Sequence, residues 1–169
     1  MLAICMVLAL TITVIGSVSV FANSDRLLPI YCVETDKKQI AISFDAAWGN
    51  DDTQQLIDIL KEYNAPATFF VVGAWVDKYP ESVKALHDAG HQIQNHSNTH
   101  PHMPQLSREQ MKDEIESCNK KISDITGKTP TLLRPPYGDY DNALIETLTE
   151  LNMYTIQWDV ETIATKVIV

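Results

Sequence analysis

The feature that most constrains the fold is a regular alternation of short apolar segments with amphipathic segments. Five segments have strand length and are rich in apolar and β-branched residues, and the segments between them show helical periodicity. Continuous apolar strands separated by helices are typical of a parallel sheet covered by helices, so the sequence predicts an α/β fold, as a sheet or a barrel. The predicted strands are 39–45, 67–73, 91–95, 131–134 and 153–160, and the predicted helices are 52–63, 80–89, 107–126 and 141–151.

Polar residues follow several of these strands at the point where each strand ends. Asp45 ends the first predicted strand, and Arg134 ends the fourth. His96 and His100 follow the third, within the sequence NHSNTHPH. Because ligands of α/β proteins gather at the carboxyl ends of the strands, the sequence predicts a functional site at this edge.

The chemistry of these residues suits a metal-assisted hydrolysis. Imidazoles four residues apart, as in His96 and His100, can bind one zinc-sized cation together with a carboxylate and water. Asp45 is the candidate base or ligand, and Arg134 is expected to pair with it and orient it. The rigid sequence RPPYG is expected to direct the backbone N–H of Tyr137 at a developing oxyanion.

Five other residues that can bind metal or titrate receive structural interpretations. His102, beside prolines, is expected at the rim of the site. His87 and His91 flank the end of a predicted helix and are expected to be structural. Cys32 and Cys118 are expected to be two separate buried thiols rather than a disulfide.

The motifs SFDAAWGNDD, ATFFVVG, HSNTH, RPPYG and WDVET occur in this order between Ser43 and Thr162, and the resemblance that they carry covers about residues 39–161. Together they resemble the polysaccharide deacetylases of the NodB-homology type, carbohydrate esterase family 4, in particular the branch with sporulation and cell-wall deacetylases. The resemblance implies a distorted (β/α) barrel and a metal-dependent hydrolase. Such an enzyme removes N-acetyl groups from N-acetylglucosamine or N-acetylmuramic acid in peptidoglycan or a chitin-like polymer, and releases acetate.

The resemblance also assigns roles to the candidate residues. Asp45 matches the catalytic base, Arg134 the residue that orients it, and Tyr137 the backbone donor to the oxyanion. His96 and His100 match two ligands of a divalent metal, for which zinc is preferred and cobalt, nickel or manganese are alternatives.

Position 46 departs from the family pattern. The first motif of the family carries two adjacent aspartates, the base and then a metal ligand, but Ala46 occupies the second position here. We expect Asp51 or Asp52 to substitute, with Asp52 completing the metal set of His96 and His100. Otherwise water fills the position and the metal affinity falls.

The end of the chain also departs from the pattern. The family has a late Leu-x-His motif whose histidine is the general acid, yet no histidine follows His102. We expect a C-terminally truncated or frame-shifted domain over residues 39–169, with an incomplete barrel whose last strand lacks one neighbour. The alternative function is a catalytically impaired, carbohydrate-binding pseudoenzyme of the envelope.

Residues 2–22 carry no charged side chain and precede the polar sequence NSDR. They predict a signal peptide or an N-terminal membrane anchor over residues 1–22, followed by a linker over 23–38. Either interpretation places the domain outside the cytoplasm, secreted or membrane-anchored at the cell envelope. The net charge of −9 and the scattered Lys and Arg argue against nucleic-acid binding. The expected partner is a glycan polymer, and the expected state is a monomer.

Overall fold

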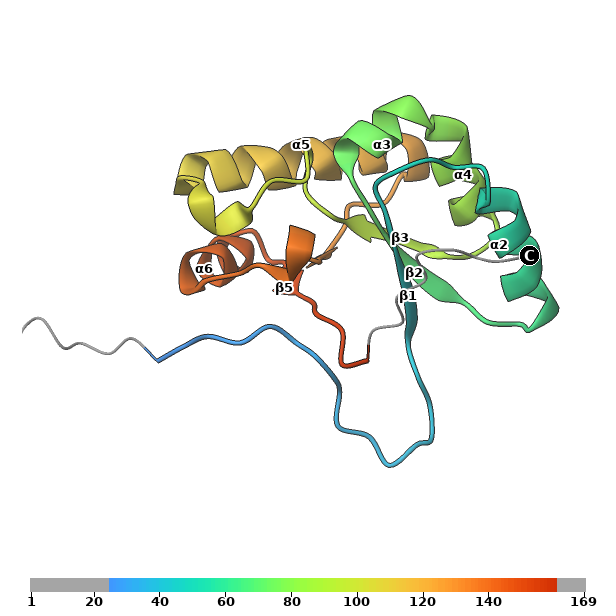
Figure 1. Ribbon diagram of the computed structural model, residues 1–169, viewed down its shortest axis with the longest axis horizontal. Helices are drawn as coiled ribbons and strands as arrows, with labels where there is room; N and C mark the ends of the chain where they lie inside the picture. Colours follow the sequence, from blue (N-terminus) through green and yellow to red (C-terminus); the bar gives the residue numbers. More distant parts are fainter. Residues whose placement is uncertain (1–24, 161–169) are drawn as a thin grey trace, which may run out of the picture.

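A parallel sheet of five strands lies at the centre of the computed structural model, which describes residues 25–160 (Figure 1). The predicted signal or anchor segment and residues 161–169 lie outside the described residues. Each strand pairs with its neighbours in the chain, in the order β1-β2-β3-β4-β5, and all pairs are parallel. The strands are β1 (Ile42–Ala46), β2 (Ala67–Val71), β3 (Gln92–Asn95), β4 (Leu132–Leu133) and β5 (Tyr154–Thr155). The α/β prediction is confirmed, and the sequential strand order is the one found in (β/α) barrels.

Helices connect successive strands and cover the sheet (Figure 1). They are α2 (Thr53–Glu62), α3 (Gly73–Lys78), α4 (Pro80–Asp88), α5 (Arg108–Thr126) and α6 (Asn142–Glu150), with 3-10 turns η1 (Met103–Gln105) and η2 (Pro136–Gly138). Four of the helices match the predictions closely. Helix α3 was not predicted from the sequence, because this single short helix follows β2 directly and has no capping side chain.

The ends of α5 show how directly some boundaries are encoded. Ser107 and Gln110 form a reciprocal capping box at its start, and Gly127 ends it with a left-handed φ of 69°. Helix α5 then packs on both buried clusters of the domain. Cys118 and Ile122 belong to the cluster beneath β1, β2 and β3, whereas Met111 and Ile115 belong to the cluster shared with α6. The helix therefore joins the two halves of the core.

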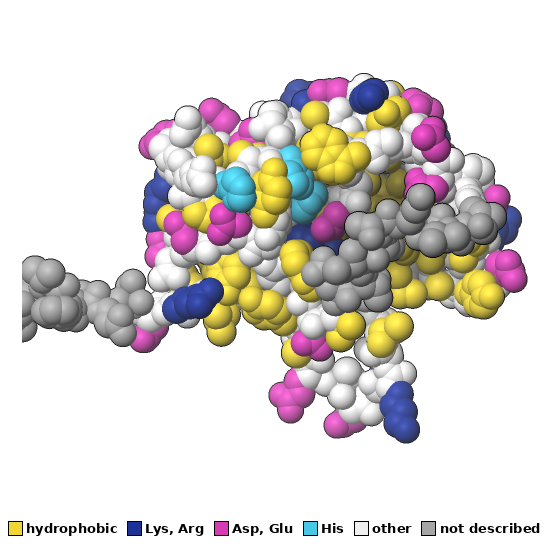
Figure 2. Space-filling view, viewed as in Figure 1, with side chains coloured by type: hydrophobic (Ala, Val, Ile, Leu, Met, Phe, Trp, Pro, Cys, Tyr) yellow, Lys and Arg dark blue, Asp and Glu magenta, His cyan; other side chains and the backbone are white. Residues whose placement is uncertain are grey.

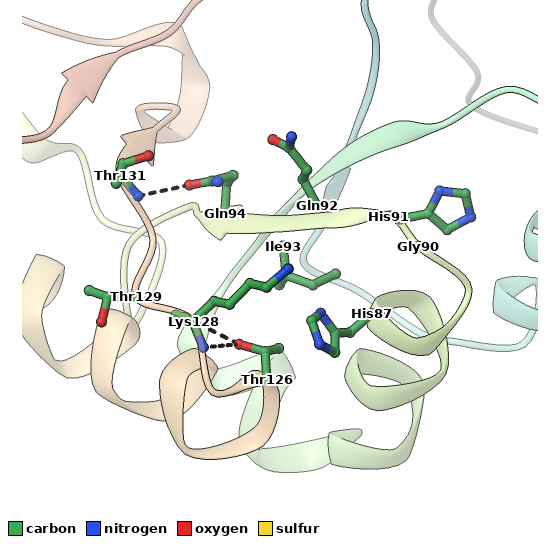
Figure 3. Close-up of a pocket in the computed structure, with 10 residues that line it drawn as sticks. All are labelled: His87, Gly90, His91, Gln92, Ile93, Gln94, Thr126, Lys128, Thr129 and Thr131. Atoms are coloured by element: carbon green, nitrogen blue, oxygen red, sulfur yellow. Dashed lines mark hydrogen bonds between the residues drawn. The ribbon is translucent and has the colours of Figure 1, made fainter.

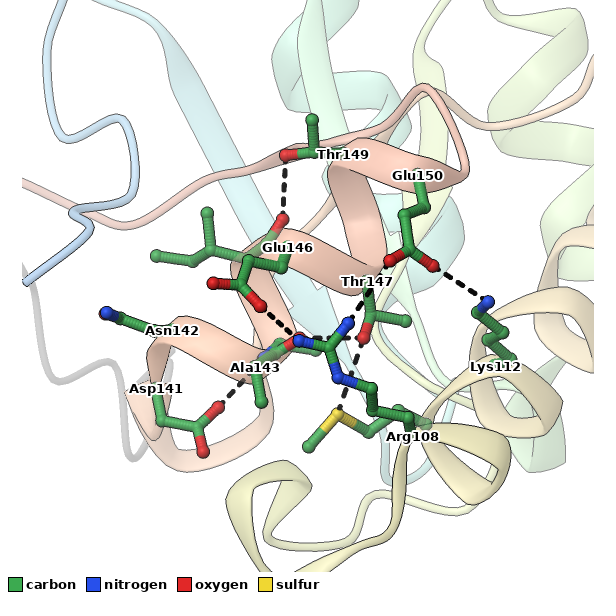
Figure 4. A network of polar contacts seen from close by, with 12 residues as sticks. Arg108, Lys112, Asp141, Asn142, Ala143, Glu146, Thr147, Thr149 and Glu150 are labelled. Atoms are coloured by element: carbon green, nitrogen blue, oxygen red, sulfur yellow. Dashed lines mark hydrogen bonds and ion pairs between the residues drawn. The ribbon is translucent and has the colours of Figure 1, made fainter. Parts of the chain in front are cut away.

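An ion-pair network on the surface also joins α5 to α6 (Figure 4). Arg108 pairs with Glu146 and Glu150, and Lys112 pairs with Glu150 at 2.8 Å. All four side chains are about half exposed, so each pair contributes little to stability. The apolar cluster beneath the network is the main attachment of α6.

The last strand differs from its prediction in length and in its neighbour. β5 contains two residues rather than eight, and Ile30 forms a bridge beside it with Ile156. The N–H of Ile30 donates to Thr155 O, and the N–H of Gln157 donates to Ile30 O, both at 2.9 Å. The expected bare edge at the last strand is thus partly covered by the segment predicted as a linker. Residues following Ile30 form a loop that projects from the body before β1 (Figure 1).

The opposite edge of the sheet is β1, which pairs only with β2 within residues 25–160. The prediction for the two thiols is half right: Cys118 is buried, but Cys32 is exposed on the segment before β1. Of the described residues, none forms a helix long and apolar enough to cross a membrane.

Candidate functional site

The first three strands end level with one another. Ala46 lies opposite Val71, and Val71 lies opposite Asn95. Asp45 immediately precedes the first of these residues, and His96 immediately follows the last. The parallel register therefore brings an acid and an imidazole from distant parts of the sequence to one edge of the sheet.

Arg134, which follows β4, reaches across this edge to β1. Its Nη1 donates to Asp45 Oδ1 and its Nη2 donates to Ser43 Oγ, both at 2.7 Å. The guanidinium is buried and lies over the ring of Phe70, 4.1 Å from the ring centroid, whereas the Asp45 side chain is 35% exposed. Arg134 thus holds one oxygen of Asp45 and leaves the other accessible.

His96 is almost fully buried, and its tautomer follows from its partner. Its Nδ1 lies 2.7 Å from the carbonyl oxygen of Arg134, which can only accept, so Nδ1 carries the proton. The lone pair is then on Nε2, 3.8 Å from Asp45 Oδ2. Burial lowers the pKa of His96, although the nearby Asp45 carboxylate acts in the opposite direction. The ring is therefore neutral near pH 7 and presents a free nitrogen to the site.

His100 lies beside His96, with a distance of 5.0 Å between the ring centroids. Its backbone has a positive φ of 63°, which is uncommon for a residue with a side chain. Its Nδ1 is buried and has no hydrogen-bond partner among residues 25–160. Burial also lowers the pKa of His100. The two imidazoles together supply neutral nitrogen donors of the kind that zinc-type cations prefer.

Glu114 of α5 holds the loop between these histidines, and the sequence interpretation missed it. Its Oε2 accepts the backbone N–H groups of Asn98 and Thr99 at 2.8 Å, and its Oε1 accepts the Thr99 hydroxyl at 2.7 Å. A Cβ atom on Gly73 would lie 3.1 Å from the Cα of Asn98, so the loop also needs a glycine at the start of α3. No local sequence signal links Glu114 to a loop 15 residues earlier.

Asn95 provides a second support that the sequence did not reveal. Its side chain is fully buried and accepts the N–H of Ser97 at 2.7 Å. It also donates to Ile115 O at 2.9 Å and to Asn119 Oδ1 at 2.8 Å. Its neighbour Ser97 has a positive φ of 65°. These bonds fix the chain direction just before the histidine loop.

Asp52 is not brought together with the histidine pair. It is exposed at the N-terminus of α2, where its side chain makes no capping hydrogen bond. No group of three or more His, Cys, Asp or Glu side chains within residues 25–160 is arranged to hold a metal ion. The predicted set of His96, His100 and Asp52 is thus not a ready-made metal cluster within these residues, and the role of Asp52 as a ligand stays a prediction. The donor chemistry of the histidine pair fits zinc.

Tyr137 lies in η2 with a positive φ of 61°, and its ring is exposed. The ring contacts His100 edge-on, with 4.6 Å between the centroids. It also stacks on His102 at 4.1 Å with an angle of 15° between the planes, and His102 Nδ1 lies 3.1 Å from Asp139 Oδ2. Tyr137 and His102 thus form one rim of the site.

A cleft of about 470 Å³ continues from the site along the open edge of β1 and the side of α2. Its lining includes Ser43, Asp45, Trp48, Asp52, Arg134 and Trp158.

A separate cavity of about 430 Å³ lies at the amino-terminal end of β3 (Figure 3). Gln94 crosses it to accept the backbone N–H groups of Thr131 and Leu132. His91, on its wall, has Nδ1 3.3 Å from the N–H of Ala67, which fits the structural role expected for it. None of the predicted site residues lines this cavity.

Comparison with known proteins identifies relatives of most of the described domain. A family model described as polysaccharide deacetylase matches residues 33–156. A peptidoglycan-N-acetylmuramic acid deacetylase of Bacillus subtilis is 36% identical over 131 residues, which are 77% of this chain and 50% of the relative. A peptidoglycan-N-acetylglucosamine deacetylase of Bacillus cereus is 29% identical over 148 residues, 88% of this chain and 54% of the relative.

Among solved structures, a CE4 family pseudoenzyme from Bacillus anthracis superposes with a TM-score of 0.79. It is 33% identical in sequence, and the match covers 82% of this chain and 49% of that one. A mutant of that pseudoenzyme is described as having restored enzymatic activity. The present chain spans about half the length of the curated relatives it matches.

Proposed function

Because the chain belongs to the polysaccharide deacetylase family, we propose that it is a metal-dependent N-deacetylase of cell-wall polysaccharide. The observation that carries the proposal is the Asp45 carboxylate, fixed by Arg134 at 2.7 Å and facing the free Nε2 of His96. A carboxylate oriented beside neutral imidazoles suits hydrolysis of an amide by an activated water.

In the proposed reaction, Asp45 takes a proton from water, and the resulting hydroxide adds to the acetyl carbonyl carbon. The backbone N–H of Tyr137 donates to the oxyanion of the tetrahedral intermediate. The C–N bond then breaks, the proton held by Asp45 passes to the leaving nitrogen, and acetate and a free amine result. His96 and His100 would hold a divalent cation, zinc before cobalt, nickel or manganese, whose chemistry is to polarise the carbonyl.

The proposed substrate is the N-acetylglucosamine or N-acetylmuramic acid of peptidoglycan, or of a chitin-like polymer. The named activities of the Bacillus relatives support this choice. Residues 1–22 are proposed as a signal peptide or membrane anchor that places the domain outside the cytoplasm, where such polymers occur.

The test is acetate release from peptidoglycan and from N-acetylglucosamine oligomers, with added zinc and with a chelator. Asp45→Asn is expected to lower the rate at least about 100-fold, because it removes the base and keeps the shape. Asp58→Asn, an exposed change on α2, serves as the matched control and should keep the parent rate. Release that continues unchanged in Asp45→Asn would sink the proposal.

A second function is favoured by Ala46 and by the likeness to the Bacillus anthracis pseudoenzyme. Here the domain binds envelope glycan without turnover. Glycan binding that survives the combined His96→Ala and His100→Ala changes, with no acetate released by the parent protein, would support this alternative and count against the deacetylase.

A further inference from the structure

Trp48 is the most exposed tryptophan of the described chain, and its position is not explained by the core. It lies in the loop after β1 and is 83% exposed. Its ring contacts His100, with 5.8 Å between centroids and an interplanar angle of 62°. A single exposed ring needs no explanation, but exposed rings that gather beside one loop mark a binding surface.

Tyr137 carries a second exposed aromatic ring that contacts the same histidine, His100, and this ring is held in place. The residue is 60% exposed and adopts a left-handed backbone conformation that is strained for a bulky side chain. Stacking on His102 fixes the plane of the ring, and Asp139 fixes His102. The ring is therefore presented to solvent in one orientation rather than left free.

The rings of His102, Tyr137, His100 and Trp48 form a continuous row, in which each ring contacts the next. Figure 2 shows histidine and hydrophobic side chains side by side across this face of the molecule, close to acidic and basic side chains. Beyond Trp48 the row opens into the cleft between β1 and α2. That cleft combines the ring of Trp158 with the polar side chains of Asp52 and Gln55.

We propose that Trp48 and Tyr137 are two sugar-stacking surfaces on either flank of His100. The ligand they take is an internal segment of a β-linked N-acetylhexosamine chain, with one pyranose ring on each aromatic and the acetylated sugar between them. One face of such a pyranose carries only C–H bonds, which are attracted by the negative face of an aromatic ring, while its hydroxyls reach the polar walls of the cleft. This inference rests on the proposed function, because that function places the acetamido group at Asp45.

Binding is measured on the full chain by calorimetry, with the N-acetylglucosamine pentamer and monomer as probes and a chelator present. The chelator stops turnover, so affinity is separated from activity. The parent is expected to bind the pentamer at least about 100-fold more tightly than the monomer, since each added stacking contact contributes about tenfold.

Trp48→Ala is expected to weaken pentamer binding about tenfold, and Trp48→Phe less than about threefold, because a ring remains. Tyr137→Asn removes the other ring but retains a residue that tolerates positive φ, and should also cost about tenfold. Tyr154→Ala is the matched control, because Tyr154 is similarly exposed, at 62%, but begins β5 at the other end of the sheet.

Pentamer affinities within about twofold of the parent in both Trp48→Ala and Tyr137→Asn, with unchanged circular dichroism, would overturn the stacking proposal. So would a parent protein that does not bind the pentamer. Acetate release by the parent in zinc buffer is scored separately. If the parent releases acetate but the two ring substitutions leave the pentamer affinity unchanged, the stacking proposal fails and the deacetylase proposal stands. If the ring substitutions weaken pentamer binding but the parent releases no acetate, the deacetylase proposal fails and the stacking proposal stands.

Discussion

Two loops flank the candidate site, and they are held very differently. The histidine loop, residues 96–102, is fixed by the carboxylate of Glu114 and follows the buried amide of Asn95. The first-strand loop, residues 47–52, lies beside the open edge of β1 and exposes Trp48 and both of its aspartates. Its side-chain attachments include the indole N–H of Trp75 on Gly49 O and the amide of Asn50 on Ser82.

The difference shows where the site is complete and where it is not. Before any ligand binds, the carbonyl of Arg134 orients the His96 ring, and Glu114 of α5 holds the backbone of the loop that carries His100. On the other side, Ala46 packs partly against the apolar cluster and offers no oxygen ligand. We infer that His96 and His100 form a preorganised part of the metal site. The site lacks one carboxylate ligand, at position 46.

The largest expected difference between the two loops is in their asparagines. Asn95→Ala should lower the free energy of unfolding by about 3 kcal/mol, because it leaves buried donors and acceptors unpaired around the histidine loop. Asn50→Ala, the matched change in the first-strand loop, should cost less than about 1 kcal/mol, since its hydrogen bond is partly exposed. Urea unfolding followed by circular dichroism measures both. Equal losses would contradict the comparison.

Removal of the Glu114 carboxylate should have a smaller but more specific effect. Glu114→Ala is expected to cost about 1–2 kcal/mol in stability and to weaken zinc binding about tenfold, because the loop that carries His100 loses three hydrogen bonds. Glu116→Ala, an exposed position on the same helix, should change neither quantity. Zinc titration tests whether Glu114 positions the loop. If the substitution only destabilises the fold, the folded protein should bind zinc with unchanged affinity.

The buried histidines should also govern how stability depends on pH. Burial lowers the pKa of His91, His96 and His100 below the ordinary value of 6.5, so the unfolded chain binds protons that the folded state does not. Their contribution to stability is full above pH 6.5 and is lost as pH falls below it. His91→Gln should make the fall shallower in a chemical-denaturation series between pH 8 and 5. A stability that rises on acidification through this range would show that these histidines are not buried as described.

The smallest effect concerns the thiol beneath the histidine loop. Burial raises the pKa of Cys118 to about 12, and its Sγ donates to Val71 O at 3.4 Å. Cys118 should therefore resist alkylation in the native protein at pH 8, whereas the exposed Cys32 should react. Peptide mapping after brief alkylation checks this, and rapid labelling of Cys118 would indicate that α5 opens readily.

The course of the sheet could be predicted because its signals are local. Apolar runs marked β1, β2 and β3, and the capping residues Ser107 and Gly127 marked α5. The two-residue length of β5 and the bridge at Ile30 could not be predicted, since they depend on which segments meet in space. The short helix α3 lacked both a cap and enough length for a periodic pattern.

For the candidate site, the sequence indicated which residues gather at the strand ends but not what holds them. Asp45 and Arg134 are 89 residues apart, and their pairing follows from chemistry once the strands are parallel. The roles of Glu114 and Asn95 were not predicted, because the sequence does not show whether a polar side chain on a helix or strand forms hydrogen bonds inside the protein. The role of Asp52 as the third metal ligand stays a prediction: its chemistry suits a ligand, and it lies exposed at the start of α2 in the cleft that Asp45 also lines.

The preorganised histidine pair and the deficiency at position 46 are tested most directly by zinc titration of Ala46→Asp beside the parent protein. The added carboxylate is expected to tighten zinc binding at least about tenfold, and the combined His96→Ala and His100→Ala changes should abolish the gain. An unchanged affinity in Ala46→Asp, or a gain that persists without the two histidines, would contradict the account.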